Sequence, residues 1–336
     1  MNTEPLLAIR QLSVNFKVYG GTVHAVRQLN LDLKRGETLA IVGESGCGKS
    51  VTCQAVMGLI QKPAGQISQG EIIFAGQDIL KLSRQEQRQL QGSRIAMIFQ
   101  DPMTALNPTL SIGEQLTEGV RKHQGLDKAS AYAKAERMLS LVGIANPNER
   151  LSQYPHQLSG GLRQRIVIAM ALMCDPELLI ADEPTTALDV TIQAQVLELF
   201  EQIQAQTGIA IILITHDLGV VAKIADRIAV MYAGQCIETG NRQEIFYQPK
   251  HPYTQGLLAS VPRLDMAQNS LHSIEGQPPD LFAPPNHCAF YQRCKQALEV
   301  CSHLAPPAYS LSATRQVSCW LQDERAVSHK EAVQTP

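Results

Sequence analysis

The stretch Thr38–Ser50 reads TLAIVGESGCGKS, an apolar strand that runs into a glycine-rich loop. The loop, Gly43–Ser50, matches the pattern G-x-x-x-x-G-K-S/T, whose backbone N–H groups cradle phosphate oxygens. The helix predicted at Lys49–Ile60 adds the partial positive charge of its N-terminus. We therefore expect Lys49 to neutralise the β- and γ-phosphates of a nucleotide and Ser50 to bind Mg²⁺. A purely structural glycine turn is the alternative, and the strand and helix on either side disfavour it.

Strands and helices alternate along much of the chain. The strands Leu178–Ala181 and Ile209–Ile214 are apolar throughout and lie on either side of a helix predicted at Thr191–Thr207. Such strands are typical of a parallel sheet covered on both faces, so an α/β fold is predicted. From Ser111 to Gly143 the pattern is helical, and Leu162–Met173 predicts an apolar helix. Other predicted strands are Leu7–Phe16, Glu71–Phe74 and Ile95–Phe99, with a hairpin of Arg227–Tyr232 and Gln235–Glu238 around Ala233 and Gly234.

A pair of carboxylates ends one of the buried strands. Residues 178–183 read LLIADE. Asp182 stands where a strand-end aspartate holds the Mg²⁺ shell of a phosphate-loop enzyme. Glu183 is placed to polarise an attacking water. The alternative is an acid pair at a helix N-terminus, and the phosphate loop upstream favours the catalytic interpretation.

A second candidate anion site lies far along the chain from the first. Residues 158–162 read LSGGL and precede an apolar helix. Ser159, Gly160 and Gly161 would offer free N–H groups and a hydroxyl at the start of that helix. With this motif the chain resembles the ATP-binding cassette family, whose signature is LSGGQ. Leu162 departs from the usual glutamine, and because the serine and glycines carry the phosphate contacts we expect function to survive.

Three further motifs of this family fall in order along the chain. Gln100 in MIFQDP resembles the Q-loop, residues 187–189 (ALD) resemble the D-loop, and His216 in LITHD resembles the switch histidine. Taken alone, His216 would more often be a core histidine. Phe16 lies where the family stacks an aromatic ring on adenine, with Tyr19 as a rival. The resemblance covers about residues 5–245.

The resemblance implies a P-loop NTPase cassette at residues 1–245. It would have a RecA-like parallel-sheet core, an antiparallel β subdomain and an α-helical subdomain at about 101–160. In the family two cassettes pack head to tail, so the signature of one contacts the γ-phosphate of ATP held by the other. Glu183, His216 and Gln100 are expected to be catalytic, and Ser50, Gln100 and Asp182 to hold Mg²⁺. The expected nucleotide-binding residues are Phe16, Gly43, Ser45, Gly46, Cys47, Gly48, Lys49, Ser50, Val51, Asp182, Ser159, Gly160, Gly161 and Asp189.

The C-terminal part has a different composition. Residues 249–336 hold 10 of the 18 prolines, which predicts an extension of low regular structure at 246–322 and a loose tail at 323–336. Its cysteines, Cys288, Cys294, Cys301 and Cys319, are spaced C-x5-C-x6-C-x17-C. In a reducing compartment such thiols suggest Zn²⁺ or an iron–sulfur cluster rather than disulfides. Reduced structural thiols are the third alternative.

The extension carries a second resemblance. HPYTQGLL at residues 251–258 and the cysteine pattern after it resemble the C-terminal extension of ATP-binding subunits of dipeptide and oligopeptide importers. In the dipeptide type this extension carries a 4Fe–4S cluster, which the resemblance therefore implies here, with Zn²⁺ as the alternative. The other cysteines, Cys47, Cys53, Cys174 and Cys236, share no spacing. Because Cys47 lies inside the phosphate loop, its oxidation is hypothesised to block ATP.

Composition limits the possible partners and location. The 336 residues have a net charge of −2 and no run of Lys and Arg, so no nucleic-acid partner is expected. No apolar stretch is long enough to cross a bilayer, and no secretory signal is expected from the N-terminus. The resemblance implies a second homologous ATPase subunit, two transmembrane permease subunits and an extracytoplasmic peptide-binding protein. It also implies a peripheral place at the cytoplasmic face of the inner membrane.

Two alternative functions stay open. A related importer of nickel or glutathione would share this design of extension. A non-transport cassette protein of DNA repair or translation belongs to another class. Such repair proteins insert long coiled coils between phosphate loop and signature, and such translation factors carry two cassettes in one chain. The short gap and the single cassette of this chain disfavour both.

Overall fold

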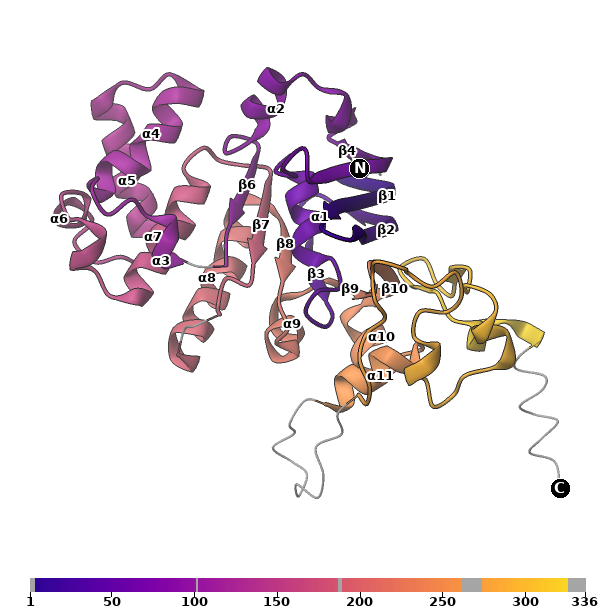
Figure 1. The fold of residues 1–336 in the computed structure, drawn as a ribbon. Coiled ribbons are helices and arrows are strands. Elements are labelled where there is room, and N and C mark those ends of the chain that lie inside the picture. The colour runs from indigo at the N-terminus through magenta and orange to yellow at the C-terminus, as the bar shows by residue number, and fades with distance from the viewer. Residues whose placement is uncertain (1–3, 101, 187–188, 261–273, 326–336) are drawn as a thin grey trace. The chain divides into compact units, whose positions relative to one another are not determined.

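The computed structural model describes residues 4–100, 102–186, 189–260 and 274–325. The chain divides into two compact units. One comprises residues 1–6, 33–38 and 74–215, and the other comprises residues 7–32, 39–73 and 216–336. Both units combine strands with helices (Figure 1), in agreement with the predicted α/β class. We call them the helical unit and the phosphate-loop unit, after the features that each contains.

The helical unit contains three parallel strands. β7 (Leu178–Asp182) lies between β6 (Ile95–Ile98) and β8 (Ala210–Ile214), and all five residues of β7 and of β8 are buried. The predicted strands at these positions are confirmed. The buried apolar side chains on both faces explain why the pattern runs without alternation. The long helix α8 (Val190–Thr207) begins after β7, and the chain then returns as β8.

Four helices of the helical unit pack together, as the magenta part of Figure 1 shows. They are α4 (Ile112–Gln124), α5 (Lys128–Leu141), α6 (Pro147–Leu151) and α7 (Gly160–Leu172). The helical pattern predicted from Ser111 to Gly143 is thus two helices. Ser111 and Glu114 form a capping box that starts the first, and Gly125, in the left-handed region, ends it. The smaller elements of this unit are β5 (Gln77–Asp78), α2 (Arg84–Leu90), α3 (Pro102–Ala105) and the 3-10 turns Ile79–Lys81 and Pro155–Gln157.

The phosphate-loop unit contains two groups of strands. In the first, β1 (Leu7–Val18) lies between β2 (Gly21–Leu33) and β4 (Gly65–Phe74). The sequence analysis missed β2, although Leu29, Leu31 and Leu33 are buried and alternate with polar residues, which is the signal of a half-buried strand. Helix α1 (Lys49–Val56) is shorter than the predicted Lys49–Ile60, since Gly58 takes up the left-handed conformation just after it.

In the second group, β3 (Thr38–Val42) pairs in parallel with β9 (Arg227–Tyr232). β9 and β10 (Gln235–Asn241) form the predicted antiparallel hairpin. The short strands β12 (Gln316–Val317) and β11 (Tyr309–Ser310) continue this sheet from β10. The extension therefore adds two strands to the sheet, which composition alone did not indicate. The helices of this group are α9 (Leu218–Ile224), α10 (Arg242–Tyr247) and α11 (Pro252–Ala259).

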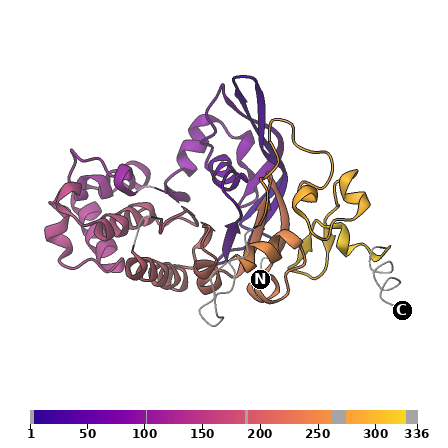
Figure 2. The same ribbon diagram turned by 60° about the horizontal axis from the view of Figure 1, so that its bottom comes forward.

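Beyond α11 the described extension consists of loops and short elements, as its yellow part shows in the turned view (Figure 2). Its 3-10 turns are Tyr291–Arg293, Glu299–Ser302 and Trp320–Gln322. Apolar side chains from these turns join a core with β9 and α11, in which Tyr232, Tyr253, Cys288, Phe290 and Cys301 are buried. Residues 274–325 contain little regular structure but still pack as a folded part, and most of the tail predicted at 323–336 lies outside the described residues. None of the helices in the described ranges is both long and apolar enough to cross a membrane.

Candidate nucleotide site

The phosphate loop has the conformation that its glycines allow. Gly43 and Gly48 have φ values of 148° and 100°. A Cβ atom on Gly43 would lie 2.2 Å from the carbonyl oxygen of Met231, and one on Gly48 would lie 2.4 Å from that of Ala25. Neither position can hold a larger residue without moving backbone, so the tight turn depends on glycine. Ser45 and Gly46 are exposed at the tip of the loop.

Lys49 turns back onto this loop. Its Nζ donates to the carbonyl oxygens of Gly43 at 2.8 Å and Glu44 at 3.0 Å, and the residue is 7% exposed. The ammonium is therefore held within the turn where a phosphate would be cradled. Ser50 and Val51 follow in the first turn of α1 and are half-buried. The structure thus gathers the predicted loop residues around one short turn at a helix N-terminus.

Cys47 is part of the same turn. It is 5% exposed, and its Sγ lies 3.7 Å from the Lys49 Nζ. Burial raises the pKa of the Cys47 thiol, and the nearby ammonium only partly opposes this shift. A buried, protonated thiol reacts slowly, because the thiolate is the nucleophile. In this conformation Cys47 is a packing residue, so the hypothesis of oxidative control requires that the loop first open.

The two aromatic candidates for the adenine contact differ in exposure. Phe16, near the end of β1, is half-buried, and its Cε1 lies 2.9 Å from the position of a Cβ on Gly65. Tyr19, in the turn between β1 and β2, is fully exposed. The contact with adenine stays a prediction that names Phe16 first and Tyr19 second.

In the helical unit the predicted acid pair ends β7. Asp182 is 7% exposed, and Glu183 follows it with φ at 48°, in the left-handed region that a glutamate rarely occupies. The Glu183 N–H donates to the Ile214 carbonyl at 2.9 Å, which anchors this strained residue to β8. Strained backbone of this kind concentrates at functional sites, where the surrounding structure holds it.

The Glu183 carboxylate is oriented by two donors. Gln100 Nε2 and Thr186 Oγ1 each lie 2.9 Å from Glu183 Oε2. The structure therefore brings together two of the predicted catalytic residues, Gln100 and Glu183. Thr186 was missed by the sequence analysis. A threonine three positions after an acidic residue at a strand end is a signal that could have suggested this hydrogen bond.

The signature serine begins helix α7. Ser159 is the N-cap, and its Oγ accepts the Leu162 N–H at 3.4 Å. Gly160 is exposed with open space beside it, whereas Gly161 faces the Ile192 side chain at 3.3 Å. Leu162 contributes its backbone N–H to the cap, so the unusual side chain at this position does not disturb it. The helix therefore begins at the predicted position, and its N-terminus is exposed.

A further residue of α7 contacts the segment after the acid pair. Gln164 is fully buried, and its Nε2 donates to the Pro184 carbonyl at 2.7 Å. The helix that begins at the signature is thereby tied to the residue after Glu183. Sequence reasoning missed Gln164, although a glutamine inside an apolar helix is a signal of a buried hydrogen bond.

The two remaining predicted residues lie at other element ends. Asp189 is the N-cap of α8 and accepts the Ile192 N–H at 2.9 Å, while Ala187 and Leu188 lie outside the described residues. His216 follows β8 in the chain and is exposed, so the core-histidine alternative is wrong. Its position leaves the imidazole accessible.

The four cysteines of the extension gather in one place. Cys288, Cys301 and Cys319 are buried, Cys294 is half-buried, and the Cys288 N–H donates to the Cys301 carbonyl at 3.2 Å. Burial, and then the neighbouring Cys301 and Cys294, raise the pKa of Cys288 to about 11. Burial and the other three thiols raise the pKa of Cys319 to about 12. None of these four cysteines forms a disulfide, and within the described ranges no three His, Cys, Asp or Glu side chains stand in metal-binding geometry.

Comparison with known protein families gives two matches. The family described as ABC transporter matches residues 26–186. The family described as oligopeptide/dipeptide transporter, C-terminal region, matches residues 237–301. The chain is 58% identical over 323 residues to the dipeptide transport ATP-binding protein DppD of Bacillus subtilis, a match that covers 96% of each chain. It is 54% identical over 331 residues to the oligopeptide transport ATP-binding protein OppD of the same organism, covering 98% of this chain and 92% of that protein.

Solved structures have the same cassette fold. CbiO1 from Clostridium perfringens, described as part of an ABC transporter complex, has a TM-score of 0.62 and 32% identity, and the match covers 73% of this chain and 92% of that one. The ATP-binding cassette MJ0796, solved as a dimer bound to ADP and phosphate, has a TM-score of 0.63 and 24% identity, covering 70% of this chain and 98% of that one. The second likeness concerns the fold alone.

Proposed function

Since this chain belongs to the ABC transporter family, as an ATPase that powers dipeptide or oligopeptide import, we propose that Gly43–Ser50 binds the ATP and Glu183 directs its hydrolysis. The hydrogen bond from Gln100 to Glu183, at 2.9 Å, is the observation that carries this assignment. It orients a carboxylate whose backbone is held in a strained conformation at a strand end. A general base must be oriented in this way toward the water that it activates.

The proposed reaction uses the nucleotide-binding and catalytic residues predicted from the sequence. The loop N–H groups and Lys49 hold the β- and γ-phosphates, and Ser50, Gln100 and Asp182 hold Mg²⁺. Glu183 accepts the proton of the attacking water, and the exposed His216 contacts the γ-phosphate. Phe16, or Tyr19 in its place, stacks on adenine. Loss of the γ-phosphate then removes the negative charge that held the facing hydrogen-bond donors of two cassettes together.

We further propose that the complete site needs a second cassette. The N-terminus of α7, with Ser159 and the open Gly160, would contact the γ-phosphate of ATP held by a second homologous ATPase subunit, and Asp189 would lie at that junction. Gln100 and the helical segment after it would pass the motion to two transmembrane permease subunits. An extracytoplasmic peptide-binding protein would deliver the peptide, and this chain would sit peripherally at the cytoplasmic face of the membrane.

The test of this assembly uses the complex that the chain forms in its own membranes. Affinity purification of the tagged chain is expected to recover a second ATPase subunit and two permease subunits. In proteoliposomes, this complex is expected to take up a labelled dipeptide only with ATP and a peptide-binding protein. Uptake of nickel or glutathione without dipeptide would favour the related importers. Recovery of ribosomes or DNA without a membrane protein would overturn the proposal.

For the extension we propose that Cys288, Cys294, Cys301 and Cys319 hold a 4Fe–4S cluster. The donor set fits, because four cysteines are the usual ligands of such a cluster. Cys288, Cys294 and Cys301 belong to one hydrophobic core, and Cys319 lies near enough to interact with all three thiols. When bound, the cluster would connect the turns of the extension that carry these residues.

The cluster proposal is tested by metal analysis of protein purified without oxygen. About four irons and four acid-labile sulfides per chain are expected, with loss of both in Cys288→Ser. Cys174→Ser, which changes a buried thiol of the helical unit, is the matched control and is expected to keep the iron. About one zinc per chain would favour the zinc alternative. Absence of both metals would leave the four cysteines as structural thiols.

A further inference from the structure

Two side chains of the extension contact the phosphate loop directly, within the phosphate-loop unit. The Glu44 N–H donates to the Tyr253 hydroxyl oxygen at 2.9 Å. Arg293 forms a two-pronged ion pair with the Glu44 carboxylate, from Nη1 to Oε2 at 2.8 Å and from Nη2 to Oε1 at 3.0 Å. We infer that Tyr253 and Arg293 are positioning residues that hold the loop in its ATP-binding conformation. This inference rests on the proposed role of the loop in binding ATP.

Packing and hydrogen bonds fix the position of Tyr253. It is completely buried, with its ring 4.7 Å from the Tyr232 ring and 5.5 Å from the Phe290 ring, centroid to centroid. Its N–H donates at 3.0 Å to Nδ1 of His251, the N-cap of α11, and Pro252 occupies the first helical position. The three residues HPY therefore have separate tasks: the histidine caps the helix, the proline starts it and the tyrosine reaches the phosphate loop.

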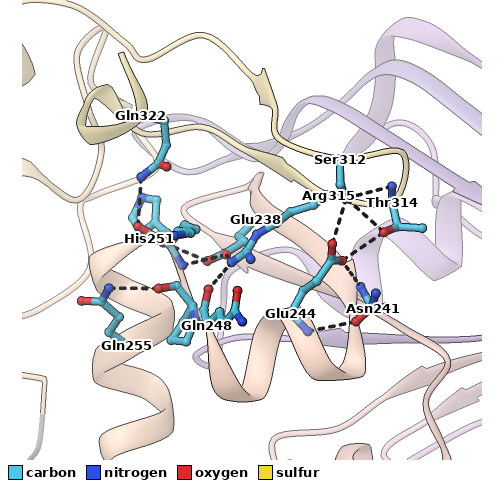
Figure 3. A network of polar contacts seen from close by, with 12 residues as sticks. Glu238, Asn241, Glu244, Gln248, His251, Gln255, Ser312, Thr314, Arg315 and Gln322 are labelled. Carbon is cyan, nitrogen blue, oxygen red and sulfur yellow. Dashed lines mark hydrogen bonds and ion pairs between the residues drawn. The ribbon is translucent and has the colours of Figure 1, made fainter. Parts of the chain in front are cut away.

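The helix that carries Tyr253 is anchored in turn. The His251 N–H donates to Glu238 Oε2 at 2.9 Å, and Arg315 pairs with Glu238 Oε1 at 2.7 Å. Figure 3 shows Glu238 between Arg315 and the chain at His251. Burial lowers the pKa of His251 to about 3, so its ring stays neutral above that pH and Nδ1 remains an acceptor for the cap. The position of the Tyr253 hydroxyl is thus determined by buried contacts.

Arg293 is equally constrained. Its side chain is 6% exposed, Nε donates to the Glu275 carbonyl at 2.9 Å, and Nη1 donates to the Tyr232 hydroxyl at 3.2 Å. The guanidinium also lies 5.7 Å from the centroid of the Tyr232 ring. A planar, fully engaged guanidinium fixes the carboxylate opposite it in one orientation. Because Arg293 precedes Cys294, its position also depends on how the cysteine-bearing turn is folded.

These contacts act on the part of the loop that holds the lysine. The Glu44 carbonyl accepts from Lys49 Nζ, while its N–H and carboxylate are held by the extension. All hydrogen-bonding groups of Glu44 are therefore engaged, next to glycines that would otherwise let the backbone turn freely. A loop ordered before binding loses less conformational entropy when ATP arrives, so its affinity for ATP is higher. The chemical step, which depends on other residues, should be little affected.

The test compares single-group changes in the full chain. Tyr253→Phe removes one hydroxyl and is expected to raise the Kd for MgATP about three- to tenfold, as the loss of one neutral hydrogen bond would. Arg293→Gln is expected to raise it about tenfold or more, because a charged pair is lost. KM should rise in parallel while kcat stays within about twofold. Arg293→Lys keeps the positive charge but cannot form the two-pronged ion pair, so its affinity should lie between those of Arg293→Gln and the wild type.

Matched controls separate positioning from general damage. Tyr309→Phe removes the hydroxyl that donates to Asp323, and Arg325→Gln removes a pair with the same carboxylate. Both side chains contact Asp323 and neither is bonded to Glu44, so both variants should keep wild-type Kd. Glu44→Gln weakens the ion pair from the loop side, and combining it with Arg293→Gln should add little to either change. This pair keeps the test valid if Tyr253→Phe folds poorly.

The outcomes distinguish the inference from the assignment on which it rests. Lys49→Ala is expected to abolish MgATP binding, and retained binding there would contradict the nucleotide site itself. If Lys49→Ala abolishes binding while Tyr253→Phe and Arg293→Gln keep wild-type Kd, the positioning role is wrong. A fall in kcat at unchanged KM, or an equal loss of affinity in Tyr309→Phe, would overturn it as well.

Discussion

Glu183→Gln is expected to lower steady-state ATP turnover about one hundredfold or more, while MgATP still binds with nearly unchanged affinity. Removal of a general base typically costs a factor of about 10² to 10⁴ in rate. Glutamine keeps the size of the side chain and can still contact Gln100 and Thr186, but it cannot accept the proton of the attacking water. The backbone at this position is strained in either case, so binding by the phosphate loop should be preserved.

The measurement is phosphate release by the assembled transporter, together with MgATP binding by the isolated chain. Glu201→Gln, an exposed position on α8, is the matched control and should keep wild-type turnover. Unimpaired turnover in Glu183→Gln with retained ATP binding would remove Glu183 from the reaction. Loss of ATP binding would show instead that the carboxylate contributes to forming the site.

Arg315→Met is expected to lower the free energy of unfolding of the extension by about 3–5 kcal/mol, the cost of leaving one member of a buried ion pair alone. The Arg315 side chain is 5% exposed and that of Glu238 is 0% exposed, with 2.7 Å between Nη2 and Oε1. Arg315 also donates to the Gln248 carbonyl. Without the guanidinium, the Glu238 carboxylate would retain only neutral donors, the N–H groups of Lys250 and His251.

The fluorescence of Trp320 can report on the unfolding of the extension alone. It is the single tryptophan of the chain and lies in the extension, where its Nε1 donates to the Leu304 carbonyl at 3.0 Å. Its fluorescence during urea denaturation therefore reports on the extension, and the midpoint and slope give the change in stability. Arg325→Met, which removes an exposed pair with Asp323, is the control and should leave the midpoint unchanged.

A double variant tests the cause of the instability. Glu238→Leu combined with Arg315→Met removes both buried charges, so it should be more stable than Arg315→Met alone. It should still be less stable than the wild type, because the N–H groups of Lys250 and His251 lose their acceptor. A single variant with unchanged stability, or a double variant less stable than Arg315→Met, would contradict the importance of this pair.

Local patterns predicted the parts of the fold that short segments specify. The boundaries of β3 agree with the prediction, and the hairpin of β9 and β10 turns at Ala233 and Gly234 as expected. Gln100 and Glu183, each predicted separately to be catalytic, form a hydrogen bond that the sequence did not predict. The sequence analysis missed β2, although the alternation of its leucines with polar residues indicates a strand, and the sequence did not indicate that β11 and β12 join β10. Strand pairing of this kind depends on residues far away in the chain.

The sequence by itself determined the phosphate loop and its chemistry, because a strand, three glycines, a lysine and a serine within Thr38–Ser50 specify the turn locally. It also identified the HPY residues and the four cysteines as a pattern. Only the tertiary structure decided what holds that loop in place. Arg293 and Glu44 are 249 residues apart in the chain and 2.8 Å apart in the fold. No spacing rule predicts such a pair, since its partners are brought together by the core that contains Tyr232 and Phe290.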